Sequence, residues 1–174
     1  MAYINRFDKD GNSSKEGHNA ETLFCEIAKS KGYLIEKSSR SDNMHKHIDF
    51  TLEGKDKKVT VDIKARKRTS RKDKKFTDDW VWLEIKNVQG RKGWLYGQAD
   101  FIVFETEDSF ILSPRKSLIE LVNSTVRFDL AFVDRAYQAK YRIYQRAKRR
   151  DQITQVKMKD ILSIKNVVTW KKKN

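Results

Sequence analysis

Residues 47–67, HIDFTLEGKDKKVTVDIKARK, carry the clearest structural pattern in the sequence. Apolar and polar side chains alternate from residue 58 to 66 and again from 47 to 53, a pattern typical of strands with one buried face. Gly54 lies between the two runs, where a reversal needs a small residue. We therefore predict an antiparallel hairpin that turns one face toward the core.

The pattern also predicts the register. A turn centred between residues 55 and 56 pairs apolar residues with apolar residues: Ile48 with Ile63, Phe50 with Val61, and Leu52 with Val59. The same register sets His47 opposite Lys64 and Asp49 opposite Asp62. The Cβ atoms of the two aspartates are then expected about 4.5–5.5 Å apart.

Two carboxylates in direct opposition weaken a sheet by up to about 1 kcal/mol, so we expect something to compensate them. A divalent cation such as Mg²⁺ takes oxygen ligands, is typically held by one or two carboxylates and keeps several waters. Lys64 shares the face of Asp62 and could hold a water or stabilise phosphate charge. The alternative is a solvated outer face, which is normal for antiparallel sheets.

Length and composition indicate one soluble domain. We take residues 1–174 as a single unit, with a core at about 13–125 and a basic C-terminal hairpin and tail at about 135–174, because one proline and seven glycines mark no linker. No apolar run approaches the roughly 20 residues that span a bilayer, and the N-terminus lacks the apolar segment of a signal peptide. We expect no membrane contact and a cytoplasmic location in a bacterial, archaeal or phage-infected cell. Cys25 is the only cysteine, which excludes an intrachain disulfide.

The charge points to nucleic acid. The chain holds 38 lysines and arginines against 24 acidic residues, a formal charge of +14, and such a field attracts polyanions. Two basic clusters supply the expected phosphate contacts, the alternative being solvated loops: Arg66, Lys67, Arg68, Arg71 and Lys72 in the first, and Arg142, Arg146, Arg149 and Arg150 in the second. Lysines 171–173 are predicted to form a frayed tail.

The remaining elements are read from period and capping. We predict a helix from Ser13 or Ser14 to about Lys31, a strand at 33–36, a polar loop at 38–44, and strands in DDWVWLEIKNV, ADFIVFE and SFILS. A second helix is expected to start at Ser113 and Pro114 and to end near Asn123. Residues 140–158 favour a hairpin, although Tyr137, Tyr141 and Tyr144 also fit one helical face. This order predicts a mixed α/β domain.

Four segments occur in an order known from one enzyme superfamily: KEGHNAETLFCEIAKSKGY, SSRSDN, HIDF and VDIK. Residues 14–68 thus resemble the PD-(D/E)XK nucleases, most closely resolvases of Holliday junctions and phage-type nucleases. The resemblance implies a restriction-endonuclease-like αβββαβ core with a mixed central sheet and extra C-terminal strands. It departs from the family at Ile48, where a proline is usual, and at Asp62, where glutamate is commoner.

By that resemblance, Asp49, Asp62 and the backbone carbonyl of Ile63 bind Mg²⁺ or Mn²⁺. Lys64 assists the attacking water and Glu21 approaches from the first helix as a further catalytic group. Ser41 lies in the serine-bearing loop and is an accessory candidate.

Other side chains are weaker candidates. His47 is expected to contact a phosphate or to lie near the active centre; with His45 and Asp49 it could form a transition-metal site, and it could also be an ordinary surface histidine. Gln98 could orient a water or a phosphate. Two further alternatives stay open: Trp94 and Tyr96 either stack on an unpaired base or are buried, and Glu84 is a candidate additional carboxylate.

The sequence thus predicts a Mg²⁺- or Mn²⁺-dependent DNA endonuclease, selective for branched DNA and, if resolvase-like, a homodimer. The rival hypothesis is a nucleic-acid-binding protein that does not cleave. RNA is a third option as substrate, because nothing in the sequence reads a 2′-hydroxyl.

Overall fold

The computed structural model describes residues 12–70 and 73–173. Its helices and strands follow in this order: α1 (Asn12–Ser30), β1 (Leu34–Lys37), α2 (Arg40–Lys46), β2 (Phe50–Glu53), β3 (Lys58–Lys64), β4 (Trp80–Lys86), the 3₁₀ turn η1 (Trp94–Tyr96), β5 (Phe101–Glu105), β6 (Ser109–Pro114), α3 (Arg115–Thr125), the 3₁₀ turn η2 (Ala136–Gln138), β7 (Gln152–Lys157), α4 (Met158–Leu162) and β8 (Val168–Lys171). The prediction of a mixed α/β domain is confirmed.

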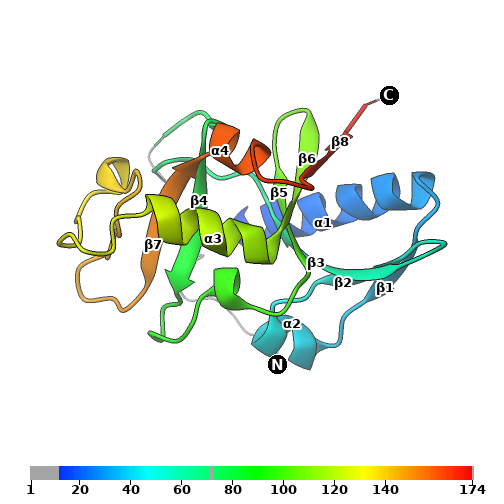
Figure 1. Cartoon of the computed structure of the whole chain (residues 1–174), viewed down its shortest axis with the longest axis horizontal. Helices are drawn as coiled ribbons and strands as arrows, with labels where there is room; N and C mark the ends of the chain where they lie inside the picture. The colour runs from blue at the N-terminus through cyan, green and yellow to red at the C-terminus, as the bar shows by residue number, and fades with distance from the viewer. Residues whose placement is uncertain (1–11, 71–72, 174) are drawn as a thin grey trace.

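Six strands form the central sheet in the order β1-β2-β3-β5-β6-β8. Only the contact between β3 and β5 is parallel, so the sheet is mixed. The strand between them in sequence, β4, leaves this sheet and pairs with β7 in a second, two-stranded sheet. Figure 1 shows β4 and β7 side by side at one end of the molecule.

The hairpin is confirmed in its central part. Phe50 pairs with Val61 and Leu52 with Val59, as the apolar pattern predicts. The predicted pairs beyond Phe50 are wrong, because the strand begins there: His47 adopts the left-handed conformation (φ 53°) that ends α2, and the Asp49 amide donates to the carbonyl of Val61, 2.8 Å away.

The central sheet separates two apolar layers. Phe50, Leu52, Val61 and Ile63 pack with α1 around Phe24 on one face, while Ile102 and Phe104 of β5 face α3, α4 and the small sheet on the other. Because strand side chains alternate, Asp62 and Lys64 lie on the second face, away from the α1 core. The sheet thus directs these two polar side chains toward the β4–β7 sheet.

Several local predictions need correction. The segment expected to be a polar loop contains helix α2, which Ser39 caps by accepting a hydrogen bond from the Asp42 amide. Pro114 occupies the N-cap of α3 and not its first turn, and the helix runs on to Thr125.

The C-terminal region also pairs with earlier strands, which the sequence did not predict. The hairpin expected at residues 140–158 is reduced to isolated bridges, of Tyr144 with Ile153 and of Lys140 with Gln155, and β7 pairs with β4. The helical alternative for the three tyrosines is wrong beyond the short turn η2. The predicted frayed tail is wrong too: β8 pairs with β6, Trp170 is buried, and Lys172 contacts Glu105. None of the described helices is both long and apolar enough to cross a membrane.

Candidate metal centre and adjoining cleft

Asp49 and Asp62 meet at the point where β2 begins. Asp62 lies in the middle of β3 and is 2% exposed, whereas Asp49 precedes β2 and is 9% exposed. The Asp49 carboxylate accepts two hydrogen bonds, from the Ile63 amide (2.7 Å) and from the Asn43 side-chain amide (2.5 Å). Its charge acts on Asp62 and raises the pKa of that carboxyl. The two carboxylates therefore lie near each other, although not as the directly opposed pair that the register predicted.

The surroundings of Asp62 disfavour its ionised form. The pKa of Asp62 is raised to about 7, mainly by burial; the Lys64 ammonium opposes this rise, and the charge of Asp49 adds to it. The Lys64 ammonium lies 2.6 Å from Asp62 Oδ1. Asp62 Oδ2 is buried and finds no hydrogen-bond donor among the described residues. A proton or a cation would satisfy this oxygen, because buried polar atoms normally have partners.

The donors present fit a hard divalent cation. Asp62 Oδ2 has an unused acceptor, Asp49 lies beside it, and Mg²⁺ is commonly held by only one or two carboxylates. No group of three or more histidine, cysteine or acidic side chains suited to a metal occurs in residues 12–70 and 73–173. A two-carboxylate site that keeps waters needs no third acidic ligand.

Two predicted metal contacts look different in the structure. Ile63 approaches Asp49 through its amide N–H, and the role predicted for its carbonyl stays a prediction. The alternative transition-metal site is wrong in its geometry, because His45 is exposed on α2 and His47 follows in a left-handed turn, so they do not share a strand face with Asp49. His47 nevertheless lies near the centre: burial and Lys64 lower its pKa, and Asp49 raises it.

Lys64 connects the groups around the centre. Besides its ion pair with Asp62, its ammonium lies 4.8 Å from the centre of the Trp94 ring. Its charge lowers the pKa of Glu21 and of Glu84. Burial dominates both carboxyls and leaves their pKa values raised. The Lys64 ammonium therefore lowers the pKa values of three acidic side chains, Asp62, Glu21 and Glu84.

Glu21 reaches this centre from α1, as the resemblance implied. It is half-buried, and after burial the strongest influence raising its pKa is Asp49. Glu84 comes from β4 and accepts a hydrogen bond from the Trp94 amide at 3.2 Å. The second sheet thus contributes a carboxylate that the hairpin motif alone does not identify.

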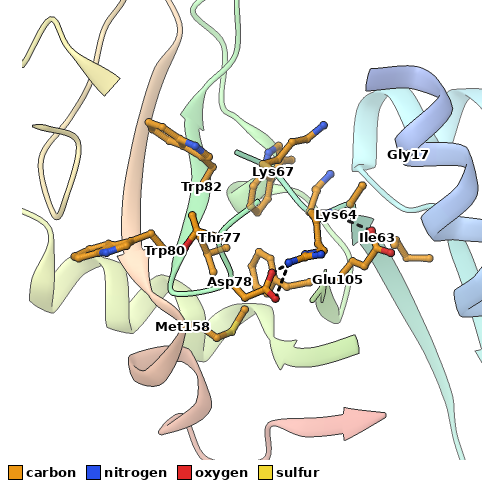
Figure 2. Close-up of a pocket in the computed structure, with 15 residues that line it drawn as sticks. Gly17, Ile63, Lys64, Lys67, Thr77, Asp78, Trp80, Trp82, Glu105 and Met158 are labelled. Atoms are coloured by element: carbon orange, nitrogen blue, oxygen red, sulfur yellow. Dashed lines mark hydrogen bonds and ion pairs between the residues drawn. The ribbon is translucent and has the colours of Figure 1, made fainter. Parts of the chain in front are cut away.

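A cavity of about 230 Å³ opens beside Lys64, between the end of β3 and the second sheet. Figure 2 shows its lining, with Lys64 and Lys67 on one side and Trp80 and Trp82 carried by β4. A second cavity of about 500 Å³ shares Lys67 and Trp82 with the first. We refer to the two adjoining cavities together as the cleft; its smaller part is lined by Lys64, the ion-pair partner of Asp62.

The first basic cluster is only partly available for phosphate. The Arg66 guanidinium binds both oxygens of Asp78 at 2.8 and 3.1 Å, and Arg68 lies 3.7 Å from Glu16. Arg66 thus has a structural role where the sequence predicted a phosphate contact. Lys67 is exposed and lines the cleft. Arg71 and Lys72 lie outside the described residues.

The second basic cluster is spread over the surface near β7. Arg146 Nε lies 2.9 Å from Asp151 and lines the larger cavity, whereas Arg142 donates to the carbonyl of Ala131. The side chain of Arg150 lies against Gly90, and Arg149 is half-buried. Of these four, only Arg146 lines the cleft.

The accessory candidates Ser41 and Gln98 are exposed. Gln98 donates its backbone amide to the Lys46 carbonyl at 2.7 Å, which fastens the segment before β5 to the end of α2. Sequence reasoning missed Asn43, the side chain that holds Asp49, because the polar composition of residues 38–44 predicts a loop there. A capped helix was detectable there, since Ser39 is followed three residues later by Asp42.

The chain was compared with models of protein families, with curated proteins and with solved structures, and none of the three comparisons finds a match. The resemblance to the PD-(D/E)XK nucleases therefore depends on the motif residues and on the geometry described above.

Proposed function

We propose that the protein is a divalent-metal-dependent nuclease that hydrolyses phosphodiester bonds in DNA. The observation that carries the proposal is the buried pair of Asp49 and Asp62, with one carboxylate oxygen lacking a donor and an ammonium group beside it. Two buried carboxylates that repel one another are costly to keep unless a cation is bound when they are ionised.

In this proposal, different residues bind the metal, position its ligands and stabilise charge on the phosphate. Asp62 and Asp49 would hold Mg²⁺ or Mn²⁺, and Asn43 and the Ile63 amide keep Asp49 in position. A bound divalent cation supplies Lewis-acid stabilisation of phosphate charge and lowers the pKa of water. Lys64 then places a positive charge where negative charge develops on the phosphate, and Glu21 assists from α1.

Further parts of the proposal follow from the resemblance and from the charge. We include in it a restriction-endonuclease-like core, endonuclease action, selectivity for branched DNA and a homodimer. A hairpin that carries Asp49, Asp62 and Lys64 beside a helix that carries Glu21 supports the first of these. The formal charge of +14 supports a polyanionic substrate.

One observation favours a second candidate, a nucleic-acid-binding protein that does not cleave. Lys64 already neutralises Asp62 Oδ1, and a pKa of about 7 lets Asp62 take up a proton near neutral pH. The acidic pair can therefore be compensated without a metal.

Cleavage of labelled DNA distinguishes the two. Linear, single-stranded, flapped and four-way DNA would be incubated with Mg²⁺, with Mn²⁺ or with EDTA. We expect metal-dependent products from the wild type, loss of cleavage in Asp62→Asn, and unchanged cleavage in Asp56→Asn, which removes the same charge from an exposed turn. Binding of all substrates without cleavage of any would favour the second candidate.

A further inference from the structure

One face of the small sheet presents aromatic rings to the cleft. Trp80 and Trp82 alternate with Val81 and Leu83 along β4, so the tryptophans share a face while Leu83 points into the core. The ring of Tyr144 lies 6.1 Å from that of Trp82. Trp82 and Tyr144 both line the larger cavity, which makes them accessible from the cleft.

Positive charge lies next to these rings. Lys67, Arg68 and Arg146 line the same cavity, against one acidic residue, Glu16. Arg68 faces Glu16 and Arg146 faces Asp151, so both guanidinium groups are held in defined places. Alternating aromatic faces and cations are the combination that proteins use to bind unpaired nucleic acid.

The aromatic surface is fixed in position and is connected through the smaller cavity to Lys64. The Trp82 indole donates to the carbonyl of Arg68 at 3.1 Å, which anchors the ring to the chain that follows β3. Lys67 and Trp82 line both cavities, and the smaller cavity reaches Lys64. A chain lying in the larger cavity and continuing into the smaller one would therefore reach Lys64, which contacts Asp62.

We propose that this cleft binds an unpaired segment of DNA, with bases stacked on Trp82 and Tyr144 and phosphates passing Lys67 and Arg68 toward Lys64. The proposal rests on the proposed nuclease function and names its substrate as single-stranded DNA or the single-stranded part of a branched molecule. Stacking requires exposed base faces, which a regular duplex covers. The aromatic lining thus favours an unpaired strand over a duplex.

Binding in EDTA tests the proposal without cleavage. Fluorescence anisotropy would compare labelled oligothymidylate with an abasic oligonucleotide of equal length, which keeps the phosphates and loses the bases, and with a duplex. We expect oligothymidylate to bind about tenfold or more tightly than the abasic strand, the size of one stacked base. Equal affinities for the two strands, or tighter binding of the duplex, would overturn the proposal.

Variants locate the contact. Trp82→Ala and Tyr144→Ala should each weaken oligothymidylate binding about tenfold and leave abasic binding unchanged. Trp82→Phe, which loses the indole hydrogen bond but keeps a ring, should bind more tightly than Trp82→Ala. Phe128→Ala is the matched control, because Phe128 is an aromatic residue, 44% exposed, that lines neither cavity. Equal losses in Trp82→Phe and Trp82→Ala would show that the ring is not a stacking surface.

The two proposals fail separately. Repeating the binding in the Asp62→Asn background removes any dependence on catalysis, and we expect the preference for base-bearing strands to persist there. A wild-type protein that shows this preference but cleaves none of the DNA substrates with Mg²⁺ or Mn²⁺ would refute the nuclease alone. Cleavage without the preference would refute the stacking cleft alone. An oligouridylate arm tests the sugar: a preference for RNA of tenfold or more would overturn the assignment to DNA.

Discussion

The carboxylate of Asp49 accepts a hydrogen bond from the backbone amide of Ile63, at 2.7 Å. Ile63 lies between Asp62 and Lys64 on β3, so this contact joins the two halves of the sequence motif. The regular pairing of β2 with β3 starts at Phe50, which pairs with Val61. Asp49 precedes this pair, and its side chain accepts the hydrogen bond of Ile63, two residues after Val61 on β3. The aspartate is thereby fixed next to Asp62 by the sheet itself.

Asn43 completes this arrangement from α2, and removing its amide should weaken metal binding. Asn43→Ala leaves Asp49 Oδ1 without its donor, so the carboxylate gains freedom that metal binding must again remove. We expect a 10- to 100-fold loss in Mg²⁺ affinity, the usual effect of losing a partner of a metal ligand, with cleavage largely restored at saturating Mg²⁺. Titration calorimetry measures the affinity. Met44→Ala, on the same helix at a side chain that is 54% exposed, should change it little.

The raised pKa of Asp62 should make the metal-free protein less stable at higher pH. The folded protein keeps the Asp62 proton up to about pH 7, whereas the unfolded chain releases it near pH 3.8. The unfolded state therefore binds fewer protons between these values, and the free energy of unfolding falls as pH rises through that window. The shift of about three pKa units corresponds to about 4 kcal/mol at most.

Urea denaturation in EDTA at pH 5 and pH 8 measures this effect. Asp62→Asn should remove most of the pH-dependent loss, because an amide does not ionise, and Asp56→Asn should leave it in place. Addition of Mg²⁺ at pH 8 should restore stability to the wild type and to Asp56→Asn, but not to Asp62→Asn. A wild-type protein as stable at pH 8 as at pH 5 in EDTA would show that Asp62 is not buried as a neutral acid.

The hairpin and its register were predictable because they depend on local alternation. Phe50, Leu52, Val59 and Val61 can all be buried only in one pairing, and that pairing also brings the two aspartates near each other. The sequence did not reveal where β2 begins, because His47 and Ile48 continue the alternation although the chain there forms the end of α2. Local pattern cannot show this, since the contact with Asn43 and the left-handed turn decide it.

The second sheet was not predictable from local pattern at all. DDWVWLEIKNV identifies a strand, but its pairing with β7 joins segments about 70 residues apart, and only the packing of Leu83 and Val156 into the core fixes it. The position of Glu84 beside Lys64 and the aromatic side of the cleft follow from that pairing. The ion pair of Arg66 with Asp78 was likewise hidden, because composition shows a basic run and not the partners that each arginine finds.

Lys64 should set the pH at which the centre accepts a metal. Its ammonium lowers the pKa of Asp62, so Lys64→Met should raise that pKa further and shift half-maximal Mg²⁺ binding to higher pH. Loss of the positive charge beside the phosphate should also lower kcat about 100-fold or more. The pH profile of Mg²⁺ binding and single-turnover cleavage measure the two effects. Lys67→Met, which removes an exposed lysine from the same cavity, should weaken DNA binding and leave the pH profile in place.

Trp170 tests whether the C-terminal strand belongs to the core. Its ring stacks on Phe24 of α1 at 5.3 Å with 14° between planes, lies 5.6 Å from the Tyr33 ring, and is 8% exposed. Replacing a buried tryptophan by alanine typically lowers the free energy of unfolding by about 3–5 kcal/mol, because a large cavity is left in the core. We expect Trp170→Ala to lower the free energy of unfolding by that amount in urea denaturation. Val168→Ala on the same strand, where the side chain is 44% exposed, should change it by less than about 0.5 kcal/mol. If the two variants proved equally stable, β8 would not secure α1 to the sheet, and the frayed tail that composition suggests would be the better description.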